Sequence, residues 1–91
     1  MEAFIYHGLE LHLSEHFKER VRQRKIDVNL VHRVITYGAV RDGESGNKVV
    51  SLKIANGVKL CVVIGFGHGR ITLVTAYENV YESRTAALEV A

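Results

Sequence analysis

Two apolar runs in the second half of the chain are separated by only two residues. Residues 49–55 and 58–66 are rich in Val, Ile and Leu, and Asn56-Gly57 stands between them. Asn-Gly between two such runs is the strongest short sequence signal for a β-hairpin. The sequence therefore predicts an antiparallel hairpin, on which the rest of the domain must pack.

Further strands are predicted on both sides of this hairpin. Residues 67–69 (Gly-His-Gly) make a second reversal, and residues 70–77 are rich in Ile, Thr, Val and Tyr, which favour a strand. Residues 9–13 alternate apolar and polar side chains, the pattern of a short edge strand. Residues 42–47 are predicted to be a flexible, glycine-bearing loop that leads into the hairpin.

Two helices are predicted between residues 14 and 38. Ser14 is a suitable N-cap for a helix that runs to about Arg24, and Asp27 is a suitable N-cap for a second helix over residues 28–37. Gly38 follows this second helix, where a left-handed C-terminal cap is expected.

Length and composition indicate one folded domain. The chain has 91 residues, of which 47% are hydrophobic and 24% charged, so it can build one core but not two. The predicted fold class is α+β, with two N-terminal helices packed on an antiparallel sheet of about three to four strands. We expect a single domain over residues 1–91, in which residues 79–91 form a terminal helix or a frayed tail.

Several classes of protein are disfavoured by the residue inventory. Cys61 is the one cysteine, which excludes a disulfide framework, and its apolar surroundings predict an inert, buried thiol. The histidines outside residue 16 show no metal-ligand spacing, so neither a metal nor another cofactor is assigned. No run approaches the ~18 apolar residues of a membrane span. With no signal-like N-terminus either, the sequence predicts a cytoplasmic protein that does not contact a membrane.

Positive charge is concentrated in the middle of the chain. The net charge is only +2, but residues 14–70 are basic while both terminal segments are acidic. This distribution suits a phosphate-bearing partner such as RNA. The lysines predicted to contact RNA lie on the first helix and the sheet: Lys18, Lys48, Lys53 and Lys59.

The candidate catalytic residues lie on the first helix and the last strand. His16, Arg20 and Arg24 recur every four residues, so each step turns only about 40° around the helix axis and the three form one stripe. Thr75 and Tyr77 are two residues apart and are predicted to share one face of the last strand. Imidazole, guanidinium and hydroxyl groups together can cleave a phosphodiester without a metal, by attack of the ribose 2′-hydroxyl.

Two other interpretations of the same residues are kept open. The stripe can be the polar margin of an amphipathic helix that binds nucleic acid or protein without catalysis. Alternatively, the domain is an inert scaffold in which the stripe pairs with Glu78 or Glu82.

The helix and strand motifs together resemble a known family. Residues 13–26 read LSEHFKERVRQRKI, which contains the pattern S-x-H-x-x-x-R-x-x-x-R-x-I of the bacterial family named domain of unknown function 4258. Val31, Val34 and Gly38 fit the second helix of that family, and residues 73–77 (LVTAY) resemble its final strand. The resemblance covers residues 9–78. Phe17 departs from the small residue that usually follows the histidine, and the tail from Asn79 has no counterpart.

That resemblance implies a fold and an activity. The family is similar to the barnase, EndoU, colicin and RelE-type ribonucleases, a group that includes toxins of toxin–antitoxin and polymorphic toxin systems. It implies a RelE/barnase-like fold in which His16 is the acid or base, Arg20 and Arg24 hold the phosphate, and Thr75 and Tyr77 supply hydroxyls. The expected partners are RNA and a cognate antitoxin or immunity protein.

Overall fold

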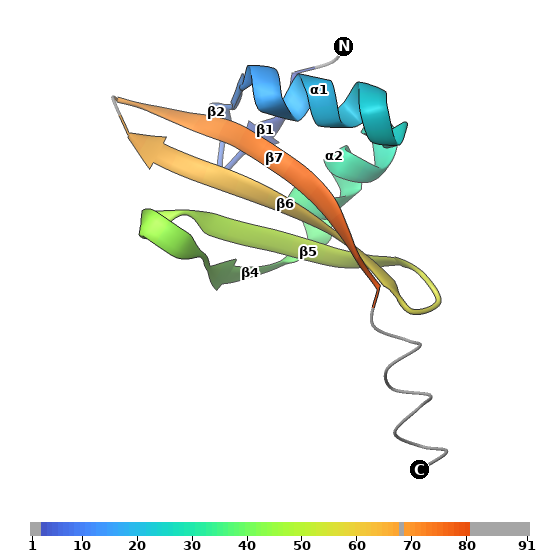
Figure 1. Cartoon of the computed structure of the whole chain (residues 1–91). Coiled ribbons are helices and arrows are strands. Elements are labelled where there is room, and N and C mark those ends of the chain that lie inside the picture. The colour runs from blue at the N-terminus through green and yellow to red at the C-terminus, as the bar shows by residue number, and fades with distance from the viewer. Residues whose placement is uncertain (1–2, 68, 81–91) are drawn as a thin grey trace.

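The computed structural model describes residues 3–67 and 69–80. Figure 1 shows a bent sheet with two helices packed against it. The elements, in chain order, are β1 (Ile5–Tyr6), β2 (Leu9–Glu10), β3 (His12–Leu13), α1 (Glu15–Arg24), α2 (Val28–Tyr37), β4 (Ala39–Asp42), the 3₁₀ turn η1 (Glu44–Gly46), β5 (Lys48–Ala55), β6 (Val58–Gly67) and β7 (Arg70–Val80). The α+β class is therefore confirmed.

The sheet is larger and more complex than the predicted antiparallel sheet. Five strands follow the order β3-β7-β6-β5-β4, and β1 pairs with β2 in a separate sheet. β3 is parallel to β7, and the other neighbours are antiparallel. Three short strands precede α1, so the prediction that the helices come first is wrong. The reason is that β3 pairs with a strand almost 60 residues later in the chain, and no local pattern encodes that pairing.

The predicted edge strand over residues 9–13 is also only partly correct. The structure divides it into β2 and β3 at Leu11, whose side chain is buried in the core. β2 turns back to pair with β1, whereas β3 pairs with β7. The two-residue alternation is the same in both, so it predicted extended backbone but not the change of partner.

The central hairpin is confirmed. β5 and β6 flank Asn56-Gly57, and Gly57 has a φ of 74°. β6 pairs in turn with β7, in agreement with the predicted second reversal, although His68 at its tip lies outside the described residues. β7 continues to Val80, so residues 79–80 belong to the strand and not to a tail. The predicted helix or frayed tail beyond them, residues 81–91, also lies outside the described part of the chain.

Both helices begin where their capping residues predict. The Ser14 hydroxyl accepts a hydrogen bond from the backbone N–H of Phe17, and the Asp27 carboxylate accepts one from Asn29. These caps satisfy N–H groups that have no partner within the first turn. α1 ends at Lys25, which adopts the left-handed conformation with φ 51°.

Gly38 ends α2 for a reason other than the expected left-handed cap. Its backbone is extended, with φ −72° and ψ 162°. A Cβ at this position would lie 2.5 Å from the carbonyl oxygen of Val34, 2.7 Å from Cγ1 of Val50 and 2.8 Å from the carbonyl oxygen of Ser51. Glycine is therefore required by the close approach of α2 to β5 and not by a positive φ.

Replacing Gly38 with alanine should destabilise the domain. Because the added Cβ meets two carbonyl oxygens, the backbone of α2 or β5 must shift, and we expect a loss of about 1–3 kcal/mol in the free energy of unfolding. Urea denaturation followed by circular dichroism measures this loss. Gly67→Ala is the matched control, since a Cβ there meets nothing within 4 Å. Equal stability of the two variants would contradict the packing argument.

The core lies between the helices and one face of the sheet. α2 packs on β5 and β6, and α1 packs on β7. Phe4 and Phe17 meet edge to face in this layer, with ring centroids 5.9 Å apart. The other buried side chains of the core are Leu11, Val31, Val34, Ile35, Val50, Leu60, Val62, Ile64, Leu73 and Ala76. No helix in the described part of the chain is long and apolar enough to cross a membrane.

Candidate nucleic-acid interface

The sheet has a second face, which points away from α2 and which Figure 1 views directly. Because side chains alternate along a strand, this face carries the residues between those of the core. We call it the open face, and its side chains over the middle of the three long strands include Val49, Ser51, Cys61, Val63, Thr72, Val74, Thr75 and Tyr77. Val49 and Cys61 are buried yet lie outside the core beneath the helices, so the open face has a small apolar layer of its own.

A β-bulge shapes the open face at the point where the candidate residues lie. Thr75 pairs with Val63 and Leu73 pairs with Ile64, so Val74 is an extra residue in β7. A Cβ on Gly65 would meet Cγ2 of Val74 at 3.0 Å, which places Val74 on the same face as Gly65. The bulge thus puts Val74 and Thr75 side by side on the open face, with Tyr77 after them.

Ser14 joins the start of α1 to this bulge through hydrogen bonds. Its hydroxyl donates a hydrogen bond to the carbonyl oxygen of Val74 at 2.7 Å, while it accepts from Phe17 at 3.0 Å. Its backbone N–H bonds to the carbonyl oxygen of Leu73. The Ser14 side chain therefore caps α1 and also joins the start of this helix to β7. His16 follows Ser14 by two residues, and Thr75 follows its partner Val74 by one residue.

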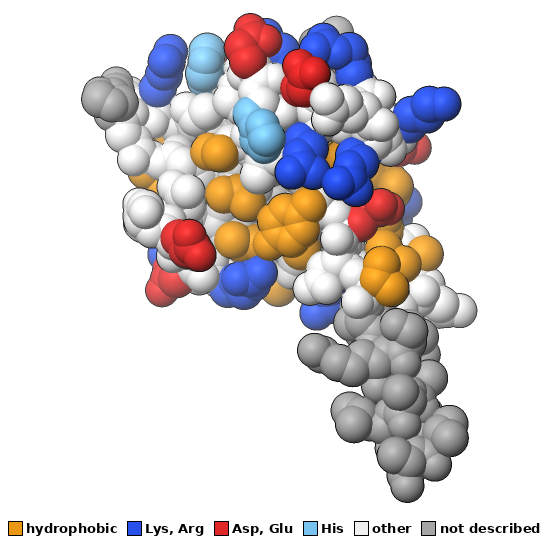
Figure 2. Space-filling model, in the orientation of Figure 1, with side chains coloured by type: hydrophobic (Ala, Val, Ile, Leu, Met, Phe, Trp, Pro, Cys, Tyr) orange, Lys and Arg blue, Asp and Glu red, His pale blue; other side chains and the backbone are white. Residues whose placement is uncertain are grey.

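The stripe of His16, Arg20 and Arg24 lies on the flank of α1 that borders the open face. Phe17 and Val21 mark the side of α1 that packs on the core. In Figure 1 α1 lies above β7. The four-residue spacing places residues 16, 20 and 24 on one flank of this helix, next to the side that carries Phe17 and Val21. Figure 2 shows histidine and basic side chains gathered above hydrophobic side chains on the face that Figure 1 views.

The cations of α1 differ in their partners. Lys18 pairs with Glu15 at 3.7 Å and Arg22 pairs with Glu19 at 3.2 Å, both within the helix. Within residues 3–67 and 69–80, no carboxylate lies within ion-pair distance of Arg20 or Arg24. The pairing with Glu78 expected of an inert scaffold is therefore not formed, and Glu82 lies outside the described residues.

Thr75 and Tyr77 are both half-buried on the open face. Oγ1 of Thr75 is shielded from solvent and has no hydrogen-bond partner among the described residues. A buried hydroxyl without a partner costs free energy, and such groups in a native fold call for a specific explanation. His16 and Arg24 are exposed, whereas Arg20 is half-buried. The structure thus places Thr75 and Tyr77 on the open face of β7, and His16, Arg20 and Arg24 on α1, the helix that packs on β7.

The four lysines predicted to bind RNA are not gathered at this border. Lys18 lies on the other flank of α1, and Lys48 lies on the helix side of the sheet, opposite Ile64 in the β5–β6 register. Lys53 and Lys59 face each other across β5 and β6 and extend the open face toward the hairpin turn. Of the four, only these two share a face with Tyr77.

Comparison with known proteins identifies the family. The model of the family described as Domain of unknown function (DUF4258) matches residues 13–78, more than half of the 91-residue chain. The chain belongs to this family. The DUF4258 match contains the whole stripe and both β7 hydroxyls, so the candidate site lies inside the region that defines the family. No curated protein and no solved structure matches the chain.

Within the DUF4258 match, a pocket next to Tyr77 was missed by the sequence analysis. It has a volume of about 260 Å³ and is lined by Arg41, Gly43, Glu44, Asn47, Val49, Val63 and Tyr77. Residues 42–47 were expected to form a flexible loop, but backbone hydrogen bonds join Gly43 to Asn47 and Asn47 to Glu44. β4 and η1 therefore hold this pocket in place. Two glycines beside a Glu and an Asn were the available signal for such a compact turn.

Asp42 at the end of β4 and Lys48 at the start of β5 form an ion pair with shifted pKa values. The Lys48 ammonium donates a hydrogen bond to the Asp42 carboxylate. This bond and the attraction between the two charges lower the pKa of Asp42 and raise the pKa of Lys48. Both groups are on the surface, so the pair contributes little to stability.

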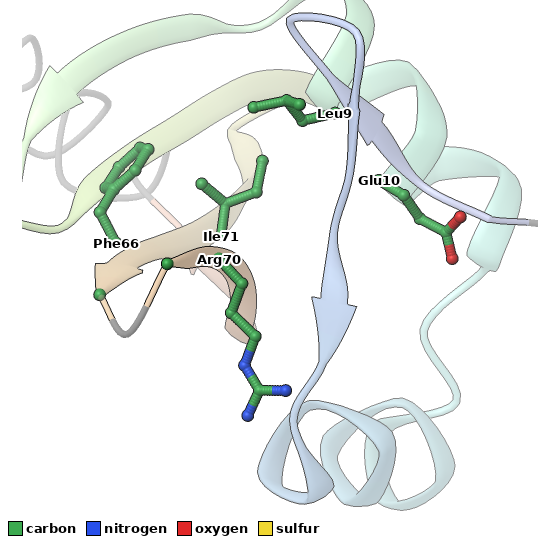
Figure 3. Close-up of a pocket in the computed structure, with 7 residues that line it drawn as sticks. Leu9, Glu10, Phe66, Arg70 and Ile71 are labelled. Carbon is green, nitrogen blue, oxygen red and sulfur yellow. The ribbon is translucent and has the colours of Figure 1, made fainter.

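A larger hollow lies at the other end of the sheet. It has a volume of about 410 Å³, and Figure 3 shows Leu9, Phe66 and Ile71 around it, with the Arg70 guanidinium directed away from them. It contains none of the residues predicted from the sequence. No group of three or more potential metal ligands occurs in the described part of the chain.

Proposed function

We propose that this DUF4258 domain is a metal-independent endoribonuclease-like domain that cleaves RNA by attack of the ribose 2′-hydroxyl and acts as a bacterial toxin in the cytoplasm. One observation carries the proposal: among the residues that the structure describes, Arg20 and Arg24 have no carboxylate partner, while Lys18 and Arg22 of the same helix have one each. Unpaired guanidinium groups beside hydroxyls and an imidazole form a surface for a phosphate.

Each residue has a distinct role in this proposal. Arg20 and Arg24 bind the phosphate oxygens, and they stabilise the negative charge that grows on the phosphorus centre in the transition state. Thr75 supplies a hydroxyl that has no hydrogen-bond partner in the described part of the chain, and because this hydroxyl is shielded from solvent, nearby side chains must move before substrate reaches it. His16 is exposed on the same flank of α1 and transfers a proton.

The reaction balances without a co-reactant. The 2′-oxygen forms a bond to phosphorus and loses its proton to a base, and the bond from phosphorus to the 5′-oxygen breaks. The leaving oxygen takes up one proton. His16 performs one of the two transfers, and the Tyr77 hydroxyl is the candidate for the other. The products are a 2′,3′-cyclic phosphate and a free 5′-hydroxyl.

Incubation of the purified chain with total RNA in EDTA tests the activity. We expect cleavage, with cyclic phosphate at the new 3′ ends, because the proposed groups need no metal. The nature of the ends distinguishes the domain from a contaminating nuclease that leaves a 3′-hydroxyl. Intact RNA after incubation with the folded wild type would overturn the proposal.

Replacing Arg20 with alanine should weaken RNA binding through the loss of one phosphate contact. We expect the slope of log affinity against log salt concentration to fall in magnitude by about 0.7 for single-stranded RNA. Arg22→Ala is the matched control, since Arg22 pairs with Glu19 on the outer side of the same helix. Binding to a fluorescent oligonucleotide at several salt concentrations measures both slopes. Identical slopes in the two variants would remove Arg20 from the site.

A non-catalytic binding module is the second candidate function. It is favoured by His16, for which no hydrogen bond or ion pair orients the imidazole within the described residues. Its partner would be a nucleic acid or a protein such as an antitoxin or immunity protein. Expression in bacteria separates the two functions. A binding module keeps its effect on growth in His16→Ala and loses it in Arg20→Glu, whereas a ribonuclease loses it in both.

A further inference from the structure

The pocket beside Tyr77 has the chemistry of a nucleobase site. Val49 and Val63 form an apolar floor, and the half-buried Tyr77 contributes an aromatic wall. Arg41 and Glu44 stand exposed at the rim. The volume of about 260 Å³ is below that of pockets for drug-sized ligands, so it suits one flat ring and not a larger molecule.

The two charged rim residues are not paired with each other or with anything else that the structure describes. No ion pair or side-chain hydrogen bond involves Arg41 or Glu44 within residues 3–67 and 69–80. A carboxylate can accept two hydrogen bonds and a guanidinium can donate two to one partner, so the residues that line the pocket include one acceptor group and one donor group.

We infer that this pocket binds a guanine base of the RNA substrate. Guanine presents two adjacent donors, N1–H and N2–H, on its Watson–Crick edge, and two acceptors, O6 and N7, on its other edge. Glu44 matches the donors and Arg41 matches the acceptors. Adenine and cytosine place an acceptor nitrogen next to their amino group, and uracil places its single N–H between two carbonyl groups. Each of these would turn an acceptor toward the Glu44 carboxylate.

Tyr77 connects the pocket to the candidate catalytic border. Its ring lines the pocket, and it lies two residues after Thr75 on the same face of β7. Tyr77 thus shares β7 with Thr75, and α1, which carries the stripe, packs on this same strand. The inference rests on the proposed function in this respect, because it names the nucleotide that the same site selects.

Binding of mononucleotides tests the pocket without requiring cleavage. The probes are guanosine 3′-monophosphate and adenosine 3′-monophosphate, titrated into the full chain and followed by the backbone amide NMR signals of residues 43–47. We expect guanosine 3′-monophosphate to bind about tenfold tighter or more, as one bidentate contact provides. Inosine 3′-monophosphate lacks the N2 amino group and should bind with intermediate affinity. Equal affinity for the guanosine and adenosine nucleotides overturns the inference.

Two carboxylate variants assign the preference to Glu44. Glu44→Gln should abolish the difference between guanosine and adenosine nucleotides, because an amide replaces one acceptor by a donor. Glu10→Gln is the matched control, since Glu10 is an exposed carboxylate on β2 away from the pocket. Circular dichroism verifies that both variants fold. A preference that survives in Glu44→Gln also overturns the inference.

The cleavage pattern separates this inference from the proposed function. Cleavage of a mixed-sequence RNA next to guanosine supports both. Cleavage without base preference overturns the guanine pocket and leaves the ribonuclease in place. Selective binding of the guanosine nucleotide by a chain that cleaves no RNA supports the guanine pocket and overturns the proposed ribonuclease activity.

Discussion

Replacement of His16 with alanine should lower the rate of RNA cleavage by about 100-fold or more, the usual contribution of a positioned acid or base. The side chain is exposed on α1 and does not belong to the core cluster, so its removal should leave the fold intact. The loss is therefore expected in the rate and not in the stability. Gel assays of a labelled oligonucleotide in EDTA measure the rate, and urea denaturation verifies the fold.

Two further measurements make this prediction specific to the imidazole. His7→Ala is the matched control, because His7 is an exposed histidine in the turn between β1 and β2, on the α2 side of the sheet. It should cleave at the wild-type rate. Added free imidazole should restore part of the activity of His16→Ala, which a purely structural defect would not permit. Undiminished cleavage by His16→Ala would leave the domain without its acid or base and end the ribonuclease proposal.

Elements with local sequence signals were predicted well. Ser14 and Asp27 mark the starts of α1 and α2 because a capping side chain bonds to a backbone N–H two or three residues later. Asn56-Gly57 marks the hairpin because its turn is complete within four residues. In each case the interaction that determines the structure lies within a few residues of the signal.

Elements that depend on distant partners were missed. β4 is exposed at all four positions, so it shows no alternation of apolar and polar residues, and only its pairing with β5 makes it a strand. The parallel pairing of β3 with β7 has no local signature either. Gly38 was correctly placed at the end of α2, but its close approach to Val50 and Ser51 depends on how the helix docks on the sheet.

In the candidate site, too, the features with a local sequence signal were predicted, and those that depend on distant parts of the chain were missed. Helical periodicity predicted the stripe of His16, Arg20 and Arg24, and strand periodicity predicted that Thr75 and Tyr77 share a face. The bulge at Val74 was not predictable, although it decides which residues of β7 reach the open face. Arg41 and Glu44 were missed because they become neighbours of Tyr77 only when β4, η1 and β7 assemble.

Replacement of Phe17 with alanine should cause the largest loss of stability. Phe17 is fully buried, meets Phe4 edge to face and is the one buried side chain of α1. Truncation of a buried aromatic ring removes its transfer free energy and leaves a cavity, so we expect the free energy of unfolding to fall by about 3–5 kcal/mol. Small domains have only about 5–15 kcal/mol in total, and this variant should therefore be partly unfolded under mild denaturing conditions.

Phe66→Ala provides the matched control for Phe17→Ala. Phe66 is 48% exposed near the end of β6, so its truncation should cost much less stability. Urea denaturation followed by circular dichroism compares the two variants. Phe17 also orients the helix that carries the stripe, so a small amount of folded Phe17→Ala should cleave RNA more slowly than its folded fraction predicts. If both variants are equally stable, Phe17 does not fix α1 on β7, and the alignment of His16 and Arg20 with Thr75 loses its physical basis.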